Sequence, residues 1–208
     1  VYKRNKSNYT DVAKKLSNLD FEAIFLPDTA EKVAEVTAFI AQENIWGIDH
    51  DERPGIIDKK KGKRRLVHYV GTSLWQSASL RHATDYIGEA VIPAWFSPAF
   101  KEKKVEVFVD RFRRVFGRLP NKYEVFTYDS VSRLRELVVE RGMHRSSAIR
   151  HALTSPVSRL QGVSGTTHFT NSGEPVRKVR FVSPDGADFE RLPFAIQLNR
   201  KGKTLSVR

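Results

Sequence analysis

The segment Asp20–Glu43, DFEAIFLPDTAEKVAEVTAFIAQE, contains the pattern that decides the fold. Its residues 23–26, Ala-Ile-Phe-Leu, form a short, continuously apolar run, which is typical of a strand buried on both faces. Pro27 ends this run, and Asp28 or Thr29 can then begin a helix by accepting a backbone N–H. Apolar residues follow at helical spacing, namely Val33, Val36 and Ile40. A buried strand followed by an amphipathic helix indicates one βα unit of a parallel sheet.

The same alternation extends along the chain in both directions. We expect a helix over Thr10–Leu19, a strand over Leu66–Val70, a helix over Ser77–Tyr86 and a strand near Glu89–Ile92. Helices that alternate with buried strands imply a parallel sheet with right-handed crossovers.

Beyond about residue 100 the sequence becomes helical. One expected helix ends at Gly117 and has a single apolar face, formed by Val105, Phe108, Phe112, Val115 and Phe116. The next runs from Pro120 to Gly142, with a stripe formed by Val125, Tyr128, Leu134, Leu137 and Val138. A short helix is expected over Ser147–Leu153, an alternating strand over Val176–Val182, and a hairpin over Ile196–Val207.

Residues 47–65 interrupt the alternation, and we expect an exposed loop insertion there because Pro54, Gly55 and Gly62 mark turns. The insertion ends in a basic run whose residues are candidates for contact with an anionic surface: Lys59, Lys60, Lys61, Lys63, Arg64 and Arg65. No aromatic residue is interleaved with them, so a solvated loop is the alternative.

The composition of the 208 residues limits the classes of function. The net charge of +12 is compatible with an anionic partner such as nucleic acid, a membrane surface or an acidic protein. There are no cysteines, which excludes disulfides and thiolate metal sites. No apolar run reaches the length of about 18 residues that a membrane-spanning helix needs. Because the chain starts Val-Tyr-Lys, we expect it to begin inside a longer protein.

Five stretches, taken in order, resemble one family. They are Asp20–Asp28 (DFEAIFLPD), Val70–Trp75 (VGTSLW), Gly88–Val91 (GEAV), Phe108–Ser130 with its Gly-Arg-Leu-Pro turn, and Gly162–Gly173. Together they resemble the type 1 periplasmic-binding-protein family of the leucine/isoleucine/valine-binding group. More narrowly, they resemble bacterial penicillin-binding-protein activators and ABC transporter substrate-binding-like proteins. The resemblance covers about residues 9–192, and it departs from the family in the basic insertion, at Ser130 and in the basic tail.

The resemblance implies an α/β fold of two lobes, a parallel sheet flanked by helices. Residues 1–88 would form a second-lobe α/β segment, with the basic insertion at 47–65. Residues 89–175 would return to the first lobe, and residues 176–208 would be a β-rich tail that crosses back. The opening part of the family fold would then be absent, which implies an incomplete first lobe, mostly helices without their sheet.

Such a fold binds its ligand between the lobes, at loops that follow the carboxyl ends of parallel strands. The residues in these loops that could contact an amino-acid-like ligand are Asp28, Thr29, Thr72, Ser73 and Trp75. Asp28 would receive an ammonium group, the hydroxyls would donate or accept hydrogen bonds, and Trp75 would form an aromatic wall. The alternative is that Asp28 and Thr29 only cap a helix and that Trp75 belongs to the core.

No catalytic, metal or cofactor pattern is present in the sequence. The six histidines lack the spacing of a zinc motif, and no acidic cluster accompanies them. Ser146 and Ser147 lie near His144 and His151, but no Gly-x-Ser-x-Gly turn supports a nucleophile there. We therefore expect no enzyme and no cofactor.

The resemblance implies a non-catalytic module located in the periplasm, or anchored in the outer membrane and facing the periplasm. It would be either an activator of a penicillin-binding protein or the solute receptor of an ABC transporter, so that its partner would be one of these membrane proteins. The alternative from another class is a basic cytoplasmic nucleic-acid-binding protein, which the charge of +12 and the run 59–65 suggest.

Overall fold

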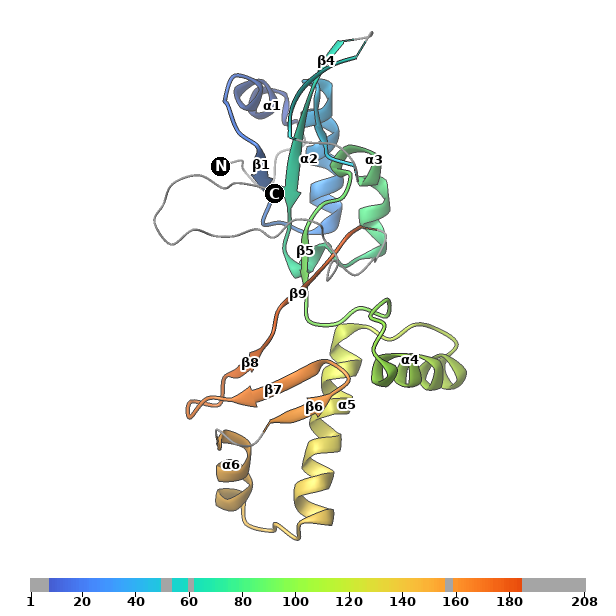
Figure 1. Ribbon diagram of the computed structural model, residues 1–208, viewed down its shortest axis with the longest axis vertical. Helices are drawn as coiled ribbons and strands as arrows, with labels where there is room; N and C mark the ends of the chain where they lie inside the picture. The colour runs from blue at the N-terminus through green and yellow to red at the C-terminus, as the bar shows by residue number, and fades with distance from the viewer. Residues whose placement is uncertain (1–7, 50–53, 60–61, 156–158, 185–208) are drawn as a thin grey trace.

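The computed structural model describes residues 8–49, 54–59, 62–155 and 159–184. The described chain forms two units joined by two strands (Figure 1). An α/β unit precedes strand β5 (Ile92–Ala94), and a mainly helical unit lies between β5 and strand β9 (Arg180–Val182). The two strands pair in antiparallel fashion, with Ile92 opposite Val182.

The α/β unit is built on strand β4 (Gly62–Val70), which pairs in parallel with β1 (Ala23–Phe25) and with β2 (Ile45–Gly47). These parallel pairs confirm the expected fold class. Helix α2 (Ala30–Gln42) returns the chain from β1 to β2, and Val33, Val36 and Ile40 are all buried, as their spacing predicts. The other helical segments are α1 (Thr10–Ser17), the 3₁₀ turns η1 (Ser73–Trp75) and η2 (Ala78–His82), and α3 (Thr84–Ile87).

Two expectations for this unit are wrong. The exposed loop expected at 47–65 contains strands where the structure describes it, because β3 (Gly55–Lys59) pairs in antiparallel fashion with β4, from Gly55 opposite Leu66 to Lys59 opposite Gly62. Strand β1 is buried on one face only: Ile24 is buried, whereas Phe25 is 60% exposed. In the part of the sheet that the structure describes, β1 is an edge strand, and the helices cover only the face that contains Ile24.

The helical unit contains α4 (Lys103–Phe116), α5 (Lys122–Arg135) with a π-helical turn η3 (Glu136–Glu140), and α6 (Ser146–Thr154). It also contains an antiparallel sheet of β6 (Leu160–Gly162), β7 (Gly165–Phe169) and β8 (Pro175–Arg177), so it is not made of helices alone. The α4 helix ends at Gly117, whose φ of 68° is a left-handed conformation that favours glycine.

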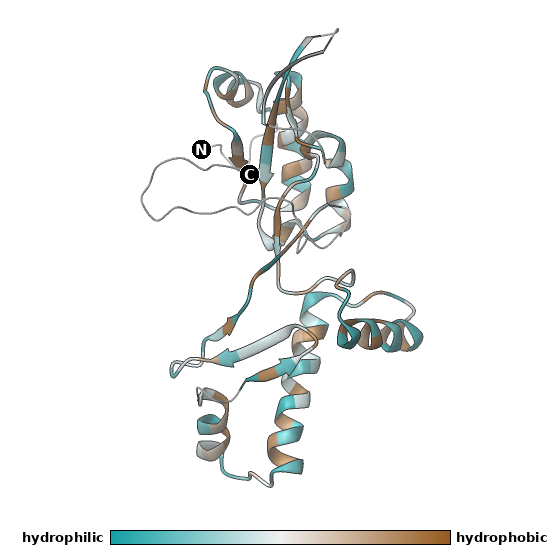
Figure 2. Cartoon of the chain, in the orientation of Figure 1, coloured by the Kyte–Doolittle hydropathy of each residue, from teal (hydrophilic) through white to brown (hydrophobic). Residues whose placement is uncertain are grey.

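The two long helices form where they were expected, and each apolar face is buried only in part. Val105, Phe108, Val125 and Leu137 are buried, but the distal end of the α4 stripe, Val115 and Phe116, is exposed, and so are Tyr128 and Leu134 of α5. Figure 2 shows apolar and polar residues alternating along both helices. Helical periodicity identifies an apolar face correctly, but it does not say whether another element covers that face.

Asp129 on α5 fixes the β6–β7 hairpin to the helix. Its carboxylate is buried and accepts hydrogen bonds from the backbone N–H groups of Val163 and Ser164, both at 2.8 Å, and from the Ser164 hydroxyl at 2.6 Å. Gly162 packs against this carboxylate so closely that a Cβ on it would lie 2.3 Å from Oδ2. The hairpin is therefore held by a charge-assisted cluster rather than by a large apolar core.

Replacing Asp129 with alanine is expected to lower the free energy of unfolding by about 2–4 kcal/mol, because it leaves two buried N–H groups without acceptors. Urea unfolding followed by circular dichroism measures the change. Asp110→Ala on the exposed face of α4 is the control and should change stability by less than about 0.5 kcal/mol. Equal effects of the two substitutions would contradict the role of Asp129.

The imidazole of His68 on β4 is half-buried, and burial lowers its pKa below the ordinary value, while Glu22 acts in the opposite direction. Since the unfolded chain then binds this proton more readily, stability falls as the pH drops through the ordinary histidine value of about 6.5. Urea unfolding at pH 7.5 and 5.5 should show a smaller loss for His68→Gln than for the unsubstituted protein. His144→Gln, at an exposed position, is the control, and an unchanged pH dependence for His68→Gln would refute the expectation.

Candidate ligand-binding site

The two loops predicted to contact a ligand lie at the same edge of the sheet. Strands β1 and β4 are parallel neighbours whose last paired residues are Phe25 and Val70, and the N–H of Leu26 donates to the carbonyl of Val70 at 3.0 Å. The chain leaves both strands at this point, so Asp28 and Thr29 emerge beside Thr72 and Ser73. This edge faces the helical unit (Figure 1).

The first loop is ordered by the start of helix α2. Asp28 is buried, and its carboxylate accepts a hydrogen bond from the N–H of Thr29 at 2.8 Å. Thr29 occupies the N-cap position, and Glu31 follows in the first turn. The pKa of Glu31 is lowered, first by its backbone N–H and then by the hydroxyls of Ser79 and Thr29. The Thr29 side chain accepts no hydrogen bond from the helix backbone, so the capping alternative left open by the sequence finds support only in the contact of Asp28.

The second loop is ordered by Thr72 and Trp75. The Thr72 hydroxyl accepts a hydrogen bond from the N–H of Leu74 at 3.3 Å and caps η1. Trp75 is completely buried, and its indole N–H donates to the carbonyl of Leu26 at 3.1 Å. A Cβ on Gly71 would lie 2.3 Å from the indole ring. Trp75 is therefore a core residue that ties the two loops together, and it has no exposed face for a ligand.

Two further side-chain hydrogen bonds connect the second loop to β5 and to the helical unit. The Lys122 ammonium group, in the first turn of α5, donates to the carbonyl of Ser73 at 3.4 Å. The side-chain amide of Gln76 donates to the carbonyl of Phe96 at 3.0 Å, just after β5. A cation from the helical unit thus lies beside Ser73.

Trp95 is an exposed aromatic residue at this junction that the sequence patterns did not indicate. It follows β5 directly, is 46% exposed, and its ring centroid lies 6.1 Å from that of Phe126 on α5. The Arg177 guanidinium stacks on the Phe126 ring, 4.2 Å from its centroid. Burial lowers the pKa of Arg177, while the charge of Asp129 acts in the opposite direction. No sequence period extends through Ile92–Pro98, so only the tertiary structure brings Trp95 to the junction.

The described residues of the basic run lie on β3 and β4, far from these loops in Figure 1. Lys60 and Lys61 lie outside the described residues, as does the expected hairpin at 196–207; Lys59 ends β3, and Lys63 on β4 is exposed. The Arg64 guanidinium lies 4.5 Å from the Trp46 ring, and Arg65 lies over Phe21 and donates to the carbonyl of Leu19. These two arginines pack against their own unit rather than extending freely.

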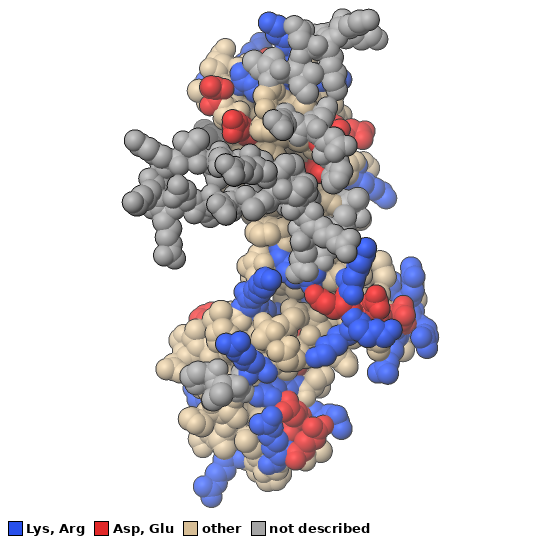
Figure 3. Space-filling view, viewed as in Figure 1, with Lys and Arg blue, Asp and Glu red and all other residues tan. Residues whose placement is uncertain are grey.

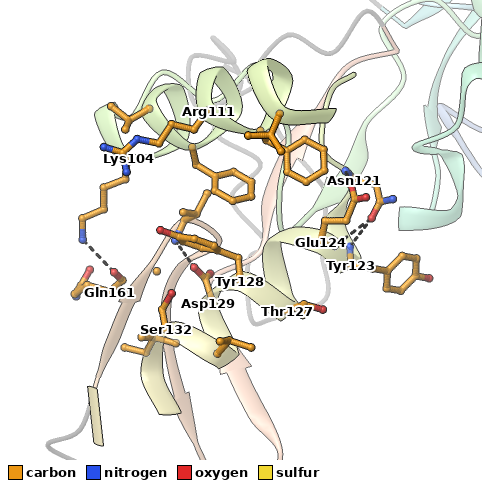
Figure 4. Close-up of a pocket in the computed structure, with 18 of the residues that line it drawn as sticks. Lys104, Arg111, Asn121, Tyr123, Glu124, Thr127, Tyr128, Asp129, Ser132 and Gln161 are labelled. Carbon is orange, nitrogen blue, oxygen red and sulfur yellow. Dashed lines mark hydrogen bonds between the residues drawn. The ribbon is translucent and has the colours of Figure 1, made fainter. Parts of the chain in front are cut away.

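The described residues form neither a metal site nor a membrane span. They contain no group of three histidine or acidic side chains that could hold a metal ion. None of their helices combines the length and apolarity needed to cross a bilayer. A groove of about 1090 Å³ lies between α4 and α5 and contains none of the ligand residues predicted from the sequence (Figure 4).

No protein-family model matches this sequence, and no curated protein matches it either. Solved structures do match. A leucine binding protein, LivK, from Thermotoga maritima superposes with a TM-score of 0.59 at 11% identity, covering 86% of this chain and 46% of that one.

Two further structures were solved with a ligand. The branched-chain amino acid transporter substrate binding protein LivJ of Streptococcus pneumoniae, in complex with isoleucine, gives a TM-score of 0.58 at 17% identity, over 87% of this chain and 46% of that one. A solute binding protein of an ABC transporter from R. palustris, in complex with benzoate, gives 0.57 at 10% identity, over 88% and 46%. The chain therefore spans slightly less than half of each protein, and over that length it has the fold of a type 1 periplasmic binding protein.

Proposed function

We propose that this chain is part of a non-catalytic solute receptor of an ABC transporter, which binds a small carboxylate-containing ligand at the junction of its two units. The observation that carries the proposal is the position of Lys122. Its ammonium group reaches the loop after β4 from the helical unit, within a fold that solved solute-binding proteins share.

The chemistry of the junction fits such a ligand. Isoleucine and benzoate, found in two of the similar structures, share a carboxylate attached to an apolar body. In this chain Lys122 would pair with the carboxylate, and the hydroxyls of Thr72 and Ser73 would add hydrogen bonds. Trp95, exposed beside Phe126, would replace Trp75 as the apolar wall. Asp28 and Thr29 would close the opposite side, where an ammonium group would be received.

We assign the two units to the lobes of a binding protein. Residues 1–88 would be the second-lobe segment, 89–175 the return to the first lobe, and 176–208 the tail that crosses back. The whole protein would act in the periplasm, with a transporter permease as its membrane partner, and ligand binding would close the lobes about the β5–β9 pair.

A second candidate function is an activator-like partner of a penicillin-binding protein, for which no small ligand is needed. Two observations favour it, because they leave fewer side chains for a small ligand: Trp75 is fully buried, and the carboxylate of Asp28 accepts a hydrogen bond at the helix start. Nucleic-acid binding has less support, because Arg64 and Arg65 pack against Trp46 and Phe21.

Thermal-shift measurements on the natural protein test the receptor proposal, with leucine, isoleucine and benzoate as probes. At a ligand concentration 100 times Kd, binding should stabilise the protein by about 2.7 kcal/mol. Lys122→Ala should abolish the shift, because the carboxylate loses its cation, whereas Lys103→Ala, an exposed lysine on α4, should leave it unchanged.

Three other outcomes would overturn the receptor proposal. Absence of any shift, together with capture of a penicillin-binding protein, would favour the second candidate. A shift that survives Lys122→Ala would remove the residue on which the proposed site depends. Binding of duplex DNA that weakens steeply with salt would favour the nucleic-acid class.

A further inference from the structure

The β3–β4 hairpin carries the densest positive charge of the chain, at a place that the candidate ligand site does not use. Residues 59–65 read Lys-Lys-Lys-Gly-Lys-Arg-Arg, so six of these seven positions are cationic. On β4, Lys63 and Arg64 are exposed, and Arg65 is partly buried. A cluster of about four to eight basic residues is typical of a segment that contacts anionic lipid headgroups.

The register of the sheet shows that the start of β4 projects beyond the other parallel strands. Strand β1 pairs with β4 at His68–Val70, and β2 pairs with β4 at Arg65–Val67. Residues 62–64 of β4 pair with β3 alone, so this part of the hairpin is a two-stranded ribbon. Figure 1 shows the ribbon extending past the helices of the α/β unit, on the side away from the helical unit. The positive charge is therefore carried at a projecting tip.

This tip lies at the opposite edge of the sheet from the candidate ligand site. The ligand loops follow the carboxyl end of β4 at Val70 and the neighbouring end of β1, whereas the tip is at the amino end of β4. Val70 lies seven residues after Lys63, or about 23 Å along an extended strand. Exposed charges at that separation are largely screened from each other at physiological ionic strength. A contact at the tip can therefore form while the ligand loops stay accessible.

The cations at the tip are not neutralised by any side chain that the structure describes. Lys63, Arg64 and Arg65 take part in none of the ion pairs between described residues. The Arg64 guanidinium lies 4.5 Å from the centroid of the Trp46 ring. The Arg65 guanidinium lies 5.5 Å from the centroid of the Phe21 ring. An aromatic ring holds a guanidinium group in place but leaves its charge intact, so both arginines present a fixed positive charge.

Figure 3 shows that charge is distributed differently over the two units. On the helical unit, Lys and Arg side chains lie among Asp and Glu side chains, and several form ion pairs, such as Arg118 with Glu124 and Arg141 with Glu136. At the end of the α/β unit from which the ribbon projects, the view shows Lys and Arg side chains, and the Asp and Glu side chains lie farther down the unit. The projecting tip is therefore the part of this face where positive charge is least compensated.

We propose that this tip, with Lys63, Arg64 and Arg65, docks on the surface of a bilayer that contains anionic lipids. A projecting ribbon suits a flat surface, because attraction to headgroups requires proximity of charge and no matching shape. Nucleic acid fits less well, because the two guanidinium groups lie on rings of their own unit instead of extending toward base edges. The inference rests on the proposed receptor function in one respect, since that function brings the protein to a membrane.

Cosedimentation of the natural protein with lipid vesicles tests the docking proposal. We expect binding to vesicles of phosphatidylcholine mixed with phosphatidylglycerol, little binding to phosphatidylcholine alone, and release as the sodium chloride concentration rises. If the anionic vesicles bound no protein, the proposal would be wrong, and the basic residues would serve only to keep a sheet edge from pairing. Equal binding to both kinds of vesicle would also refute it, because apolar insertion rather than charge would be responsible.

Substitutions that remove the same charge separate the tip from the net charge of the chain. Each tip cation should contribute about fivefold to the partition coefficient, so the double variant Lys63→Ala/Arg64→Ala should lower it about 25-fold. The control Arg145→Ala/Arg150→Ala removes two exposed cations at helix α6 and should change the partition coefficient less than about twofold. Equal losses in the two double variants would show that net charge, not the tip, drives binding.

A single substitution guards against loss of folding, because Arg64 also contacts Trp46. Lys63→Ala removes no ring contact that the structure describes, and it should lower the partition coefficient about fivefold with an unchanged circular dichroism spectrum. An unchanged partition coefficient for this variant would exclude the tip as the docking surface.

Duplex DNA provides a further comparison at the same salt concentration. Binding to DNA that is tighter than binding to anionic vesicles, and that Lys63→Ala weakens, would identify nucleic acid as the partner and overturn the proposal. None of these measurements contains a solute. They can therefore fail while leucine, isoleucine or benzoate still gives the thermal shift that the receptor proposal requires.

Discussion

The parallel pairing of β4 with β1 is the interaction on which the candidate site depends. It pairs Phe25 with Val70, two residues that are 45 positions apart in the sequence, and so brings the ends of both strands to one edge of the sheet. Trp75 then holds the two loops together, because its buried indole N–H donates a hydrogen bond from the second loop to the carbonyl of Leu26 before the first. Asp28, Thr72 and Ser73 are consequently fixed in position before any ligand is present, and such preorganisation reduces the entropy lost on binding.

One core of buried aliphatic and aromatic side chains runs through both units, from Val33 and Ile40 on α2 to Val105 on α4 and Val125 on α5. The helical unit adds polar contacts to this core, such as the Asp129 cluster and the Asn121 capping box of α5, and it leaves Val115 and Phe116 exposed. Arg180 on β9 connects the crossing strands to this unit by stacking on Phe100 and pairing with Glu102.

The sequence patterns located most helices and several strands, but not which elements pair with them or cover them. The strand at 23–26 and the helix that follows were predictable, because apolar runs and helical spacing reflect local burial directly. The hairpin at 55–70 was missed, since its basic residues and glycines are also typical of a loop, and only pairing with β4 makes them a strand. The periodicity also placed Val115 and Phe116 on the apolar face of α4, but periodicity only defines a face, and whether another element covers it decides its burial.

By itself, the sequence determined the α/β class, the positions of the longer helices and of the strands at 23–26 and 66–70, the resemblance to a type 1 periplasmic binding protein and the two loops that could contact a ligand. The tertiary structure alone decided that Trp75 is a core residue, that Trp95 and Lys122 reach the junction instead, and that an apolar face on α4 and α5 lies open. The physical reason is that local patterns record which side chains avoid water or cap a helix. Contacts between residues far apart in the chain depend on how whole strands and helices pack, and no local pattern encodes that packing.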